Sequence, residues 1–157
     1  MKASLLFLGL ILLVYSCTSE ELCEEDSISE LVASFKTESG GVVSDTTIST
    51  KLSVYGIREG QDIWFLYDSV RDSEVLLPLD PHHDFSRFVF QTAEQTDTLT
   101  LTHSRQEYMI SYSCGFGMQF TLEELQYGEG MFVKDTIINP LVNTSLEEVD
   151  THIWLYF

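Results

Sequence analysis

Apolar and polar residues alternate with a period of two along much of this chain, which is the pattern of strands that bury one face. Other stretches are short apolar runs without alternation, which are typical of strands buried on both faces. The segments predicted as strands are 31–35, 48–54, 63–67, 75–79, 88–91, 98–102, 108–114, 120–122, 132–138 and 153–157. We therefore predict an all-β domain, an antiparallel β-sandwich of about eight strands, with a small closed β-barrel as the alternative.

The pattern also predicts local features within this domain. A hairpin is expected from Thr98 to Ser113, with its turn in the polar run at 104–107. Gly115-Phe116-Gly117 predicts a bend or bulge after Cys114. A single helical turn is indicated only at 122–125.

The first residues have the pattern of a lipoprotein signal peptide. Lys2 is followed by an apolar run at 5–15, and Val14-Tyr15-Ser16-Cys17 matches a lipobox. The run is about half the roughly 20 residues that a spanning helix needs. We expect cleavage after residue 16, lipidation of Cys17, an acidic tether over 17–28 and one β domain over 29–157.

The charge of the chain limits the kinds of partner that it can bind. The formal net charge is −17 and the sequence pI is about 4.3, which argues against nucleic acid, since phosphate binding needs basic surface. The acyl chains on Cys17 are therefore the expected attachment to the membrane. The sequence indicates no cofactor.

With Cys17 assigned to lipidation, two of the three cysteines remain, Cys23 and Cys114. An even pair in an oxidising envelope compartment predicts one disulfide. The alternative is a buried thiol at Cys114 and an unpaired Cys23.

Candidate chemistry is sparse. His82, His83 and Asp84 are possible zinc ligands, but adjacent side chains of an extended chain point to opposite faces, so an exposed loop is favoured over a metal site. The sequence contains no Gly-x-Ser-x-Gly elbow, His-Glu-x-x-His pair or phosphate-binding loop, and no catalytic residue is assigned. Four aromatic residues could form a glycan platform or fill the core, namely Tyr55, Trp64, Tyr67 and Trp154.

Four phrases occur together in a fixed order: Pro78-Leu79-Asp80-Pro81, residues 97–101, Tyr112-Ser113-Cys114-Gly115-Phe116 and residues 152–157. In these the chain resembles an uncharacterised lipoprotein family of Bacteroidota, domain of unknown function 6452. The resemblance implies an envelope location, one cysteine near the start of the domain and a second in the Cys-Gly-aromatic phrase. It implies no catalytic residues.

The same resemblance makes further signals relevant. Thr18 follows the lipidated cysteine, so the Asp that retains many lipoproteins in the inner membrane is absent, and Ser19-Glu20-Glu21 resembles an export signal to the cell surface. We expect the outer membrane, on its periplasmic side or at the cell surface. Bacteroidota attach O-glycans to Ser or Thr between Asp and an aliphatic residue, Met or Thr. Candidate hydroxyls are those of Ser27, Thr46, Ser69, Thr98 and Thr136, although the motif is also ordinary strand-entry chemistry.

The function that this sequence favours is a non-enzymatic envelope lipoprotein that binds an envelope protein or glycan or organises the envelope. One alternative is a small hydrolase or carbohydrate-active accessory protein, which would need a pocket with paired carboxylates or a histidine with a shifted pKa. Another is a subunit of an outer-membrane assembly, which would expose a large apolar patch.

Overall fold

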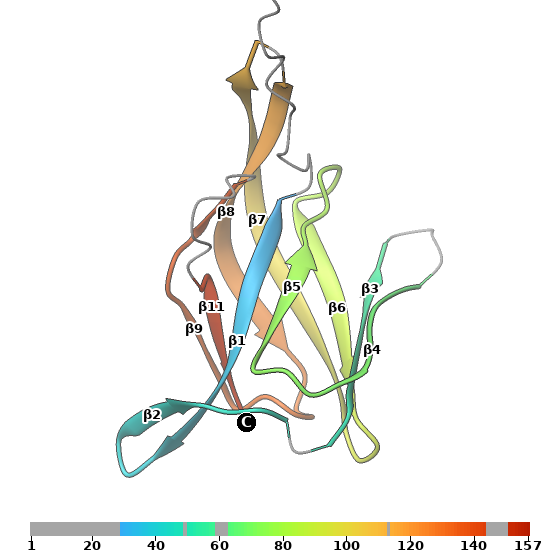
Figure 1. Ribbon diagram of the computed structural model, residues 1–157, viewed down its shortest axis with the longest axis vertical. Coiled ribbons are helices and arrows are strands. Elements are labelled where there is room, and N and C mark those ends of the chain that lie inside the picture. Colours follow the sequence, from blue (N-terminus) through green and yellow to red (C-terminus); the bar gives the residue numbers. More distant parts are fainter. Residues whose placement is uncertain (1–28, 49, 59–62, 113, 144–150) are drawn as a thin grey trace, which may run out of the picture.

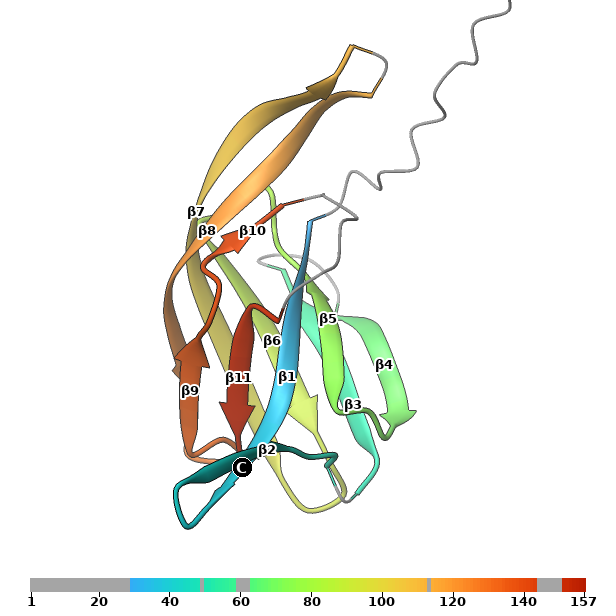
Figure 2. The same cartoon turned by 60° about the vertical axis from the view of Figure 1, so that its left-hand side comes forward.

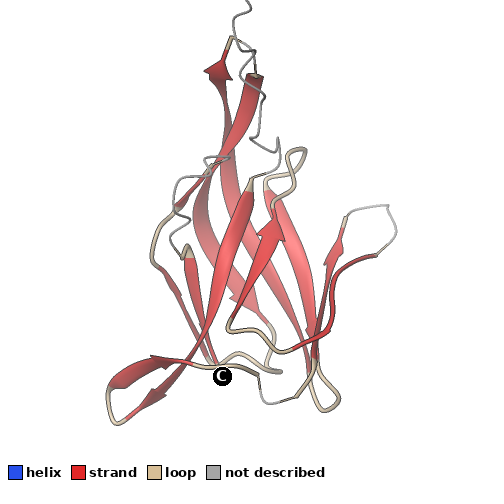
Figure 3. Cartoon of the chain, viewed as in Figure 1, coloured by secondary structure: helices blue, strands red, loops and turns tan. Residues whose placement is uncertain are grey.

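The computed structural model describes residues 29–48, 50–58, 63–112, 114–143 and 151–157, and these form eleven strands (Figure 3). The strands are β1 (Glu30–Ser39), β2 (Val42–Asp45), β3 (Leu52–Ile57), β4 (Trp64–Val70), β5 (Glu74–Pro78), β6 (Phe85–Gln91), β7 (Thr96–Ser111), β8 (Gly115–Tyr127), β9 (Lys134–Ile137), β10 (Leu141–Val142) and β11 (Ile153–Tyr156). The all-β prediction is confirmed. No helix in the described ranges has the length and hydropathy of a membrane span.

The smaller sheet is organised around β1. One edge of β1 pairs in parallel with β11, which pairs in turn with β9. The other edge pairs first with β5 and then with β2. The change of partner occurs at Phe35, whose amide donates to the Ser73 carbonyl and whose carbonyl accepts from the Thr46 amide. A single long strand thus has two successive partners along one edge.

The larger sheet has the order β10-β8-β7-β6-β3-β4, and every neighbouring pair is antiparallel. It curves around the smaller sheet, and the two form the layers of a β-sandwich (Figures 1 and 2). Side chains from both sheets meet between the layers. The Phe35 ring of β1 meets the Phe90 ring of β6 edge to face, with 6.3 Å between ring centroids.

The core contains most of the apolar residues that the alternation assigned to an inner face. Leu31, Ala33 and Phe35 are fully buried, and so are Leu99 and Leu101 on β7. Burial of each large apolar side chain contributes roughly 1.5–3 kcal/mol, which makes this interlayer packing the main source of stability. Ile48 is buried too, but it precedes β3 instead of belonging to it as predicted.

The predicted hairpin exists, but its turn was placed wrongly. Strand β7 runs without interruption through 104–107 to Ser111, and β8 begins at Gly115. All four residues at 104–107 are exposed, and β6 pairs with β7 only as far as Thr102, so this stretch of β7 pairs with β8 alone. A polar run outside the core has the composition of a turn even when it remains a strand.

Two other local predictions have opposite outcomes. Residues 122–125 lie within β8 and pair with β7, so the predicted helical turn is wrong. The bend after Cys114 is confirmed, since Gly115 has a φ of 77° and the ladder is irregular between Met109 and Ser111. A positive φ is readily adopted by glycine because it has no Cβ.

Candidate functional site

A serine and a histidine meet in the larger sheet, and this is the arrangement that most resembles a hydrolytic site. Ser86 Oγ on β6 lies 2.9 Å from His103 Nε2 on β7. The serine hydroxyl also accepts a hydrogen bond of 2.8 Å from the Asp80 amide. A serine beside a histidine is the first requirement of a nucleophile activated by a base.

The surroundings of this pair give it a structural role. Ser86 is 4% exposed and His103 is 1% exposed, so a substrate has no access to the hydroxyl. Nδ1 of His103 is buried without a hydrogen-bond partner among the described residues, so none of their carboxylates orients the ring. Burial lowers the pKa of His103 and keeps the imidazole neutral, and the ring packs edge to face on Phe120.

The Asp80 carboxylate organises the loop that contains the possible zinc ligands His82, His83 and Asp84. Its oxygens accept from the His82 amide at 2.8 Å and contact His83 Nδ1 at 3.1 Å. Burial raises the pKa of Asp80, but these hydrogen bonds and the charges of His83 and Arg58 outweigh it, so the pKa lies below its ordinary value. Asp84 instead pairs with Arg105 at 3.0 Å. The described ranges contain no group of three metal-ligating side chains.

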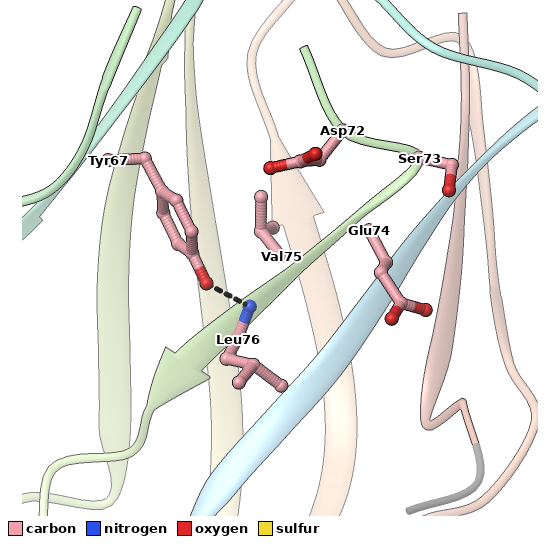
Figure 4. A pocket seen from close by; sticks show the side chains of 6 residues that line it. All are labelled: Tyr67, Asp72, Ser73, Glu74, Val75 and Leu76. Carbon is pink, nitrogen blue, oxygen red and sulfur yellow. Dashed lines mark hydrogen bonds between the residues drawn. The ribbon is translucent and has the colours of Figure 1, made fainter. Parts of the chain in front are cut away.

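A pocket of about 330 Å³ lies between β4 and β5. Figure 4 shows the Tyr67 ring along its wall, with the phenol oxygen directed at the Leu76 amide, which donates to it at 2.7 Å. Burial is the largest cause that raises the pKa of Tyr67. The phenol is therefore neutral at physiological pH, and its hydrogen bond links the two sheets.

The four aromatic residues that could have formed a glycan platform do not share one surface. Trp154 is on β11 in the smaller sheet, whereas Tyr55, Trp64 and Tyr67 are in the larger sheet. The Trp64 ring covers Gly56, where an added Cβ would lie 2.2 Å from the ring, and Arg58 packs over the same ring. Phe65 is exposed here and lies against Tyr55.

Asp97 has a structural role that the sequence did not reveal, since there it belonged only to a family phrase and to a modification motif. Its carboxylate is 3% exposed and accepts four backbone hydrogen bonds of 2.7–3.1 Å. The donors are the amides of Thr98, Gly128, Met131 and Phe132. They lie up to 35 positions away, so no local pattern reveals the contact. Asp97 therefore fixes the loop between β8 and β9.

The β7–β8 hairpin is the most prominent surface feature. It extends well beyond the sandwich body (Figures 1 and 2), and we call residues 108–112 and 114–118 the hairpin tip. Three of its apolar side chains face solvent: Tyr112 is 99% exposed, Phe116 70% and Met109 49%. Met109 and Phe116 are directly opposite in the ladder and therefore share a face.

The start of the described chain lies against this hairpin. The buried Ser29 hydroxyl donates to the Met118 carbonyl on β8. Strand β1 then runs away from the hairpin end of the sandwich towards the end that holds the C terminus (Figure 1). The segment that precedes Ser29 therefore joins the domain beside the hairpin tip.

The remaining candidate residues are divided between described and undescribed parts of the chain. Cys17, Cys23 and Ser27 lie outside the described residues, while Cys114 is half-buried at the hairpin tip, where its amide donates to Ser111 Oγ at 3.0 Å. Of the candidate glycosylation positions, Ser69 is exposed, and Thr46, Thr98 and Thr136 are half-buried.

Comparison with known proteins supports the sequence resemblance. Residues 51–157 match the family of unknown function DUF6452. Searches of curated proteins and of solved structures found no significant match. The matched region runs from just before β3 to the last residue of the chain and includes the whole β7–β8 hairpin. This chain therefore belongs to the family of unknown function DUF6452.

Proposed function

We propose that this protein is a lipid-anchored, non-enzymatic protein of the cell envelope, held at the outer membrane by acyl chains on Cys17, with the β7–β8 hairpin as its contact element. The anchor is supported by the lipobox at 14–17 and the apolar run before it. The structure of those residues lies outside the described ranges, so this part of the proposal rests on sequence.

The observation that carries the binding role is the exposed apolar hairpin tip. Exposing Tyr112, Phe116 and Met109 to water is unfavourable in free energy. The fold gains no stability from this exposure. Exposed apolar groups on a projecting element are typical of a surface that contacts a partner or a membrane. The hairpin strands are paired along their length, so the side chains are presented on a preformed scaffold.

The contacts of Ser86 and His103 favour binding over hydrolysis. Ser86 Oγ bonds to the Asp80 amide and to His103 Nε2, and both side chains are buried, so neither is open to a substrate. A hydrolytic nucleophile must instead be reached by its substrate.

Lipidation is tested by intact-mass measurement of the native protein and by membrane fractionation. The wild-type chain should carry acyl mass on residue 17 and sediment with outer membranes. Cys17→Ala should lack that mass and be released in soluble form, whereas Cys23→Ala, the matched control, should remain membrane-bound. A Cys17→Ala protein that stays in the membrane would contradict the anchor.

The contact role is tested separately, by chemical cross-linking on intact cells with a photoreactive group at residue 116. Cross-links to a partner or to lipid should form there and should be absent when the group is at Glu94, an exposed loop position. Equal labelling at both positions would contradict the assignment of the hairpin as the contact element.

A further inference from the structure

We propose that the hairpin tip lies in the headgroup layer of the same bilayer that holds the lipid anchor, with Tyr112, Phe116 and Met109 as interfacial anchors. This inference rests on the proposed lipidation of Cys17 and names the partner of the contact element. The bilayer surface then fixes the orientation of the whole sandwich.

The first support is the position of the tether. Only eleven residues, 18–28, separate Cys17 from Ser29, and a chain of this length spans at most about 40 Å. Ser29 is hydrogen-bonded to Met118, three positions from Gly115 at the turn. Along a strand this is about 10 Å. The anchored segment therefore enters the domain close to the hairpin tip, at the same end of the sandwich.

The second support is the distribution of charge. The chain has a net charge of −17, yet it has no charged residue from Tyr108 to Leu122. On β7 the charged residue nearest the turn is Glu107. It lies four positions before Ser111, or about 13 Å from the turn. The headgroup region is roughly 5–8 Å thick on each side of the hydrocarbon. The tip can therefore enter this layer while Glu107 stays in water.

The third support is the kind of side chain at the tip. Tyrosine is enriched at membrane interfaces because its ring is apolar while its hydroxyl remains hydrated. Tyr112 is 99% exposed, and Phe116 and Met109 lie side by side on the ladder. The tip therefore suits shallow insertion, not a membrane span.

The test uses the full lipidated chain in phosphatidylcholine vesicles that contain a lipid with a nitroxide spin label on its headgroup. Tyr112→Trp adds a fluorophore at the tip, and emission from Trp64 and Trp154 is subtracted with the unsubstituted protein. Val133→Trp is the matched control. Val133 is 75% exposed, and its amide bonds to the Tyr156 carbonyl near the C terminus, at the opposite end of the sandwich (Figure 1).

The added signal from the Tyr112→Trp variant should be blue-shifted and quenched roughly twofold, because tryptophan at an interface lies at headgroup level. The signal at position 133 should be unchanged. A vesicle-bound chain with an unquenched signal at position 112 would overturn the tip contact and leave the anchor intact. A blue shift without quenching would indicate a second copy of the chain and also overturn it. A chain without acyl mass that fails to float with vesicles would overturn both proposals.

Discussion

The phenol oxygen of Tyr67, on β4 of the larger sheet, accepts a hydrogen bond of 2.7 Å from the Leu76 amide on β5 of the smaller sheet. Strand β5 uses its other edge to pair with β1, so the phenol satisfies an amide on an edge that none of the described strands covers. An edge strand with unsatisfied amides is open to pairing with other chains. Tyr67 thus both joins the layers and protects an edge.

Tyr67→Phe should lower the unfolding free energy by about 1 kcal/mol, since it leaves the Leu76 amide without this acceptor. Burial raises the pKa of Tyr67 above its ordinary value of 10.0. The wild-type protein should therefore lose stability as pH rises above 10, when the unfolded chain ionises first. Urea unfolding across this range should show a smaller loss in Tyr67→Phe. An equal loss in both proteins would contradict this role.

Asp97→Asn should lower the free energy of unfolding by about 2–4 kcal/mol, because an amide nitrogen would replace one acceptor oxygen and face backbone N–H groups. Burial raises the pKa of Asp97, but its four backbone hydrogen bonds outweigh this and hold it below 3.8. The stability from its charge is therefore present above pH 3.8 and lost as pH falls through the folded pKa. Urea midpoints of both proteins measure this, with exposed Glu94→Gln as the control. A midpoint equal to that of the control would contradict the assignment.

His103 should make the protein less stable in mild acid. Burial is the largest cause that lowers its pKa below 6.5, so the unfolded chain takes up a proton before the folded one does. The unfolding free energy should decline as pH falls below 6.5, and His103→Leu should remove that decline. The exposed His82→Gln should retain it. If His103→Leu shows the same slope as wild type, another group is responsible.

A disulfide between Cys23 and Cys114 stays a prediction. Cys114 is four positions from Met118, which is bonded to Ser29, and Cys23 is six positions before Ser29. Six residues span up to about 20 Å, so the tether can reach the hairpin tip. The bridge would add roughly 4–5 kcal/mol in the chain-entropy model. Non-reducing mass spectrometry should find the linked peptides, and two free thiols would refute the pairing.

Among the described candidates for O-glycosylation, Ser69 should be modified most readily. It is exposed on β4, has a φ of 58° and interrupts the ladder with β3, so its hydroxyl is presented outside regular pairing. Thr98 is half-buried and paired with Val89, so its occupancy should be lower. Glycopeptide mapping of protein from the native host measures both sites and Ser27. A greater occupancy at Thr98 than at Ser69 would contradict the ranking.

The sequence by itself determined the strands that line the core. The alternation at Leu31, Ala33 and Phe35, and again at Leu99 and Leu101, is a local signal, because a residue's face in a strand depends only on its parity. The four phrases also sufficed to identify the family, and the match over residues 51–157 agrees. Both the alternation and the phrases are local patterns, formed by residues that are close in the sequence.

The tertiary structure alone decided which residues meet and where the chain leaves the core. Ser86 and His103 are 17 positions apart, and Asp97 reaches Phe132 across 35, so these contacts depend on the sheet order. The turn of the long hairpin was misplaced for a related reason. Polarity at 104–107 reports exposure to water, and a strand that continues past the end of its neighbour β6 is as exposed as a turn. Local pattern records the environment of a residue, whereas packing across the two sheets determines its partners.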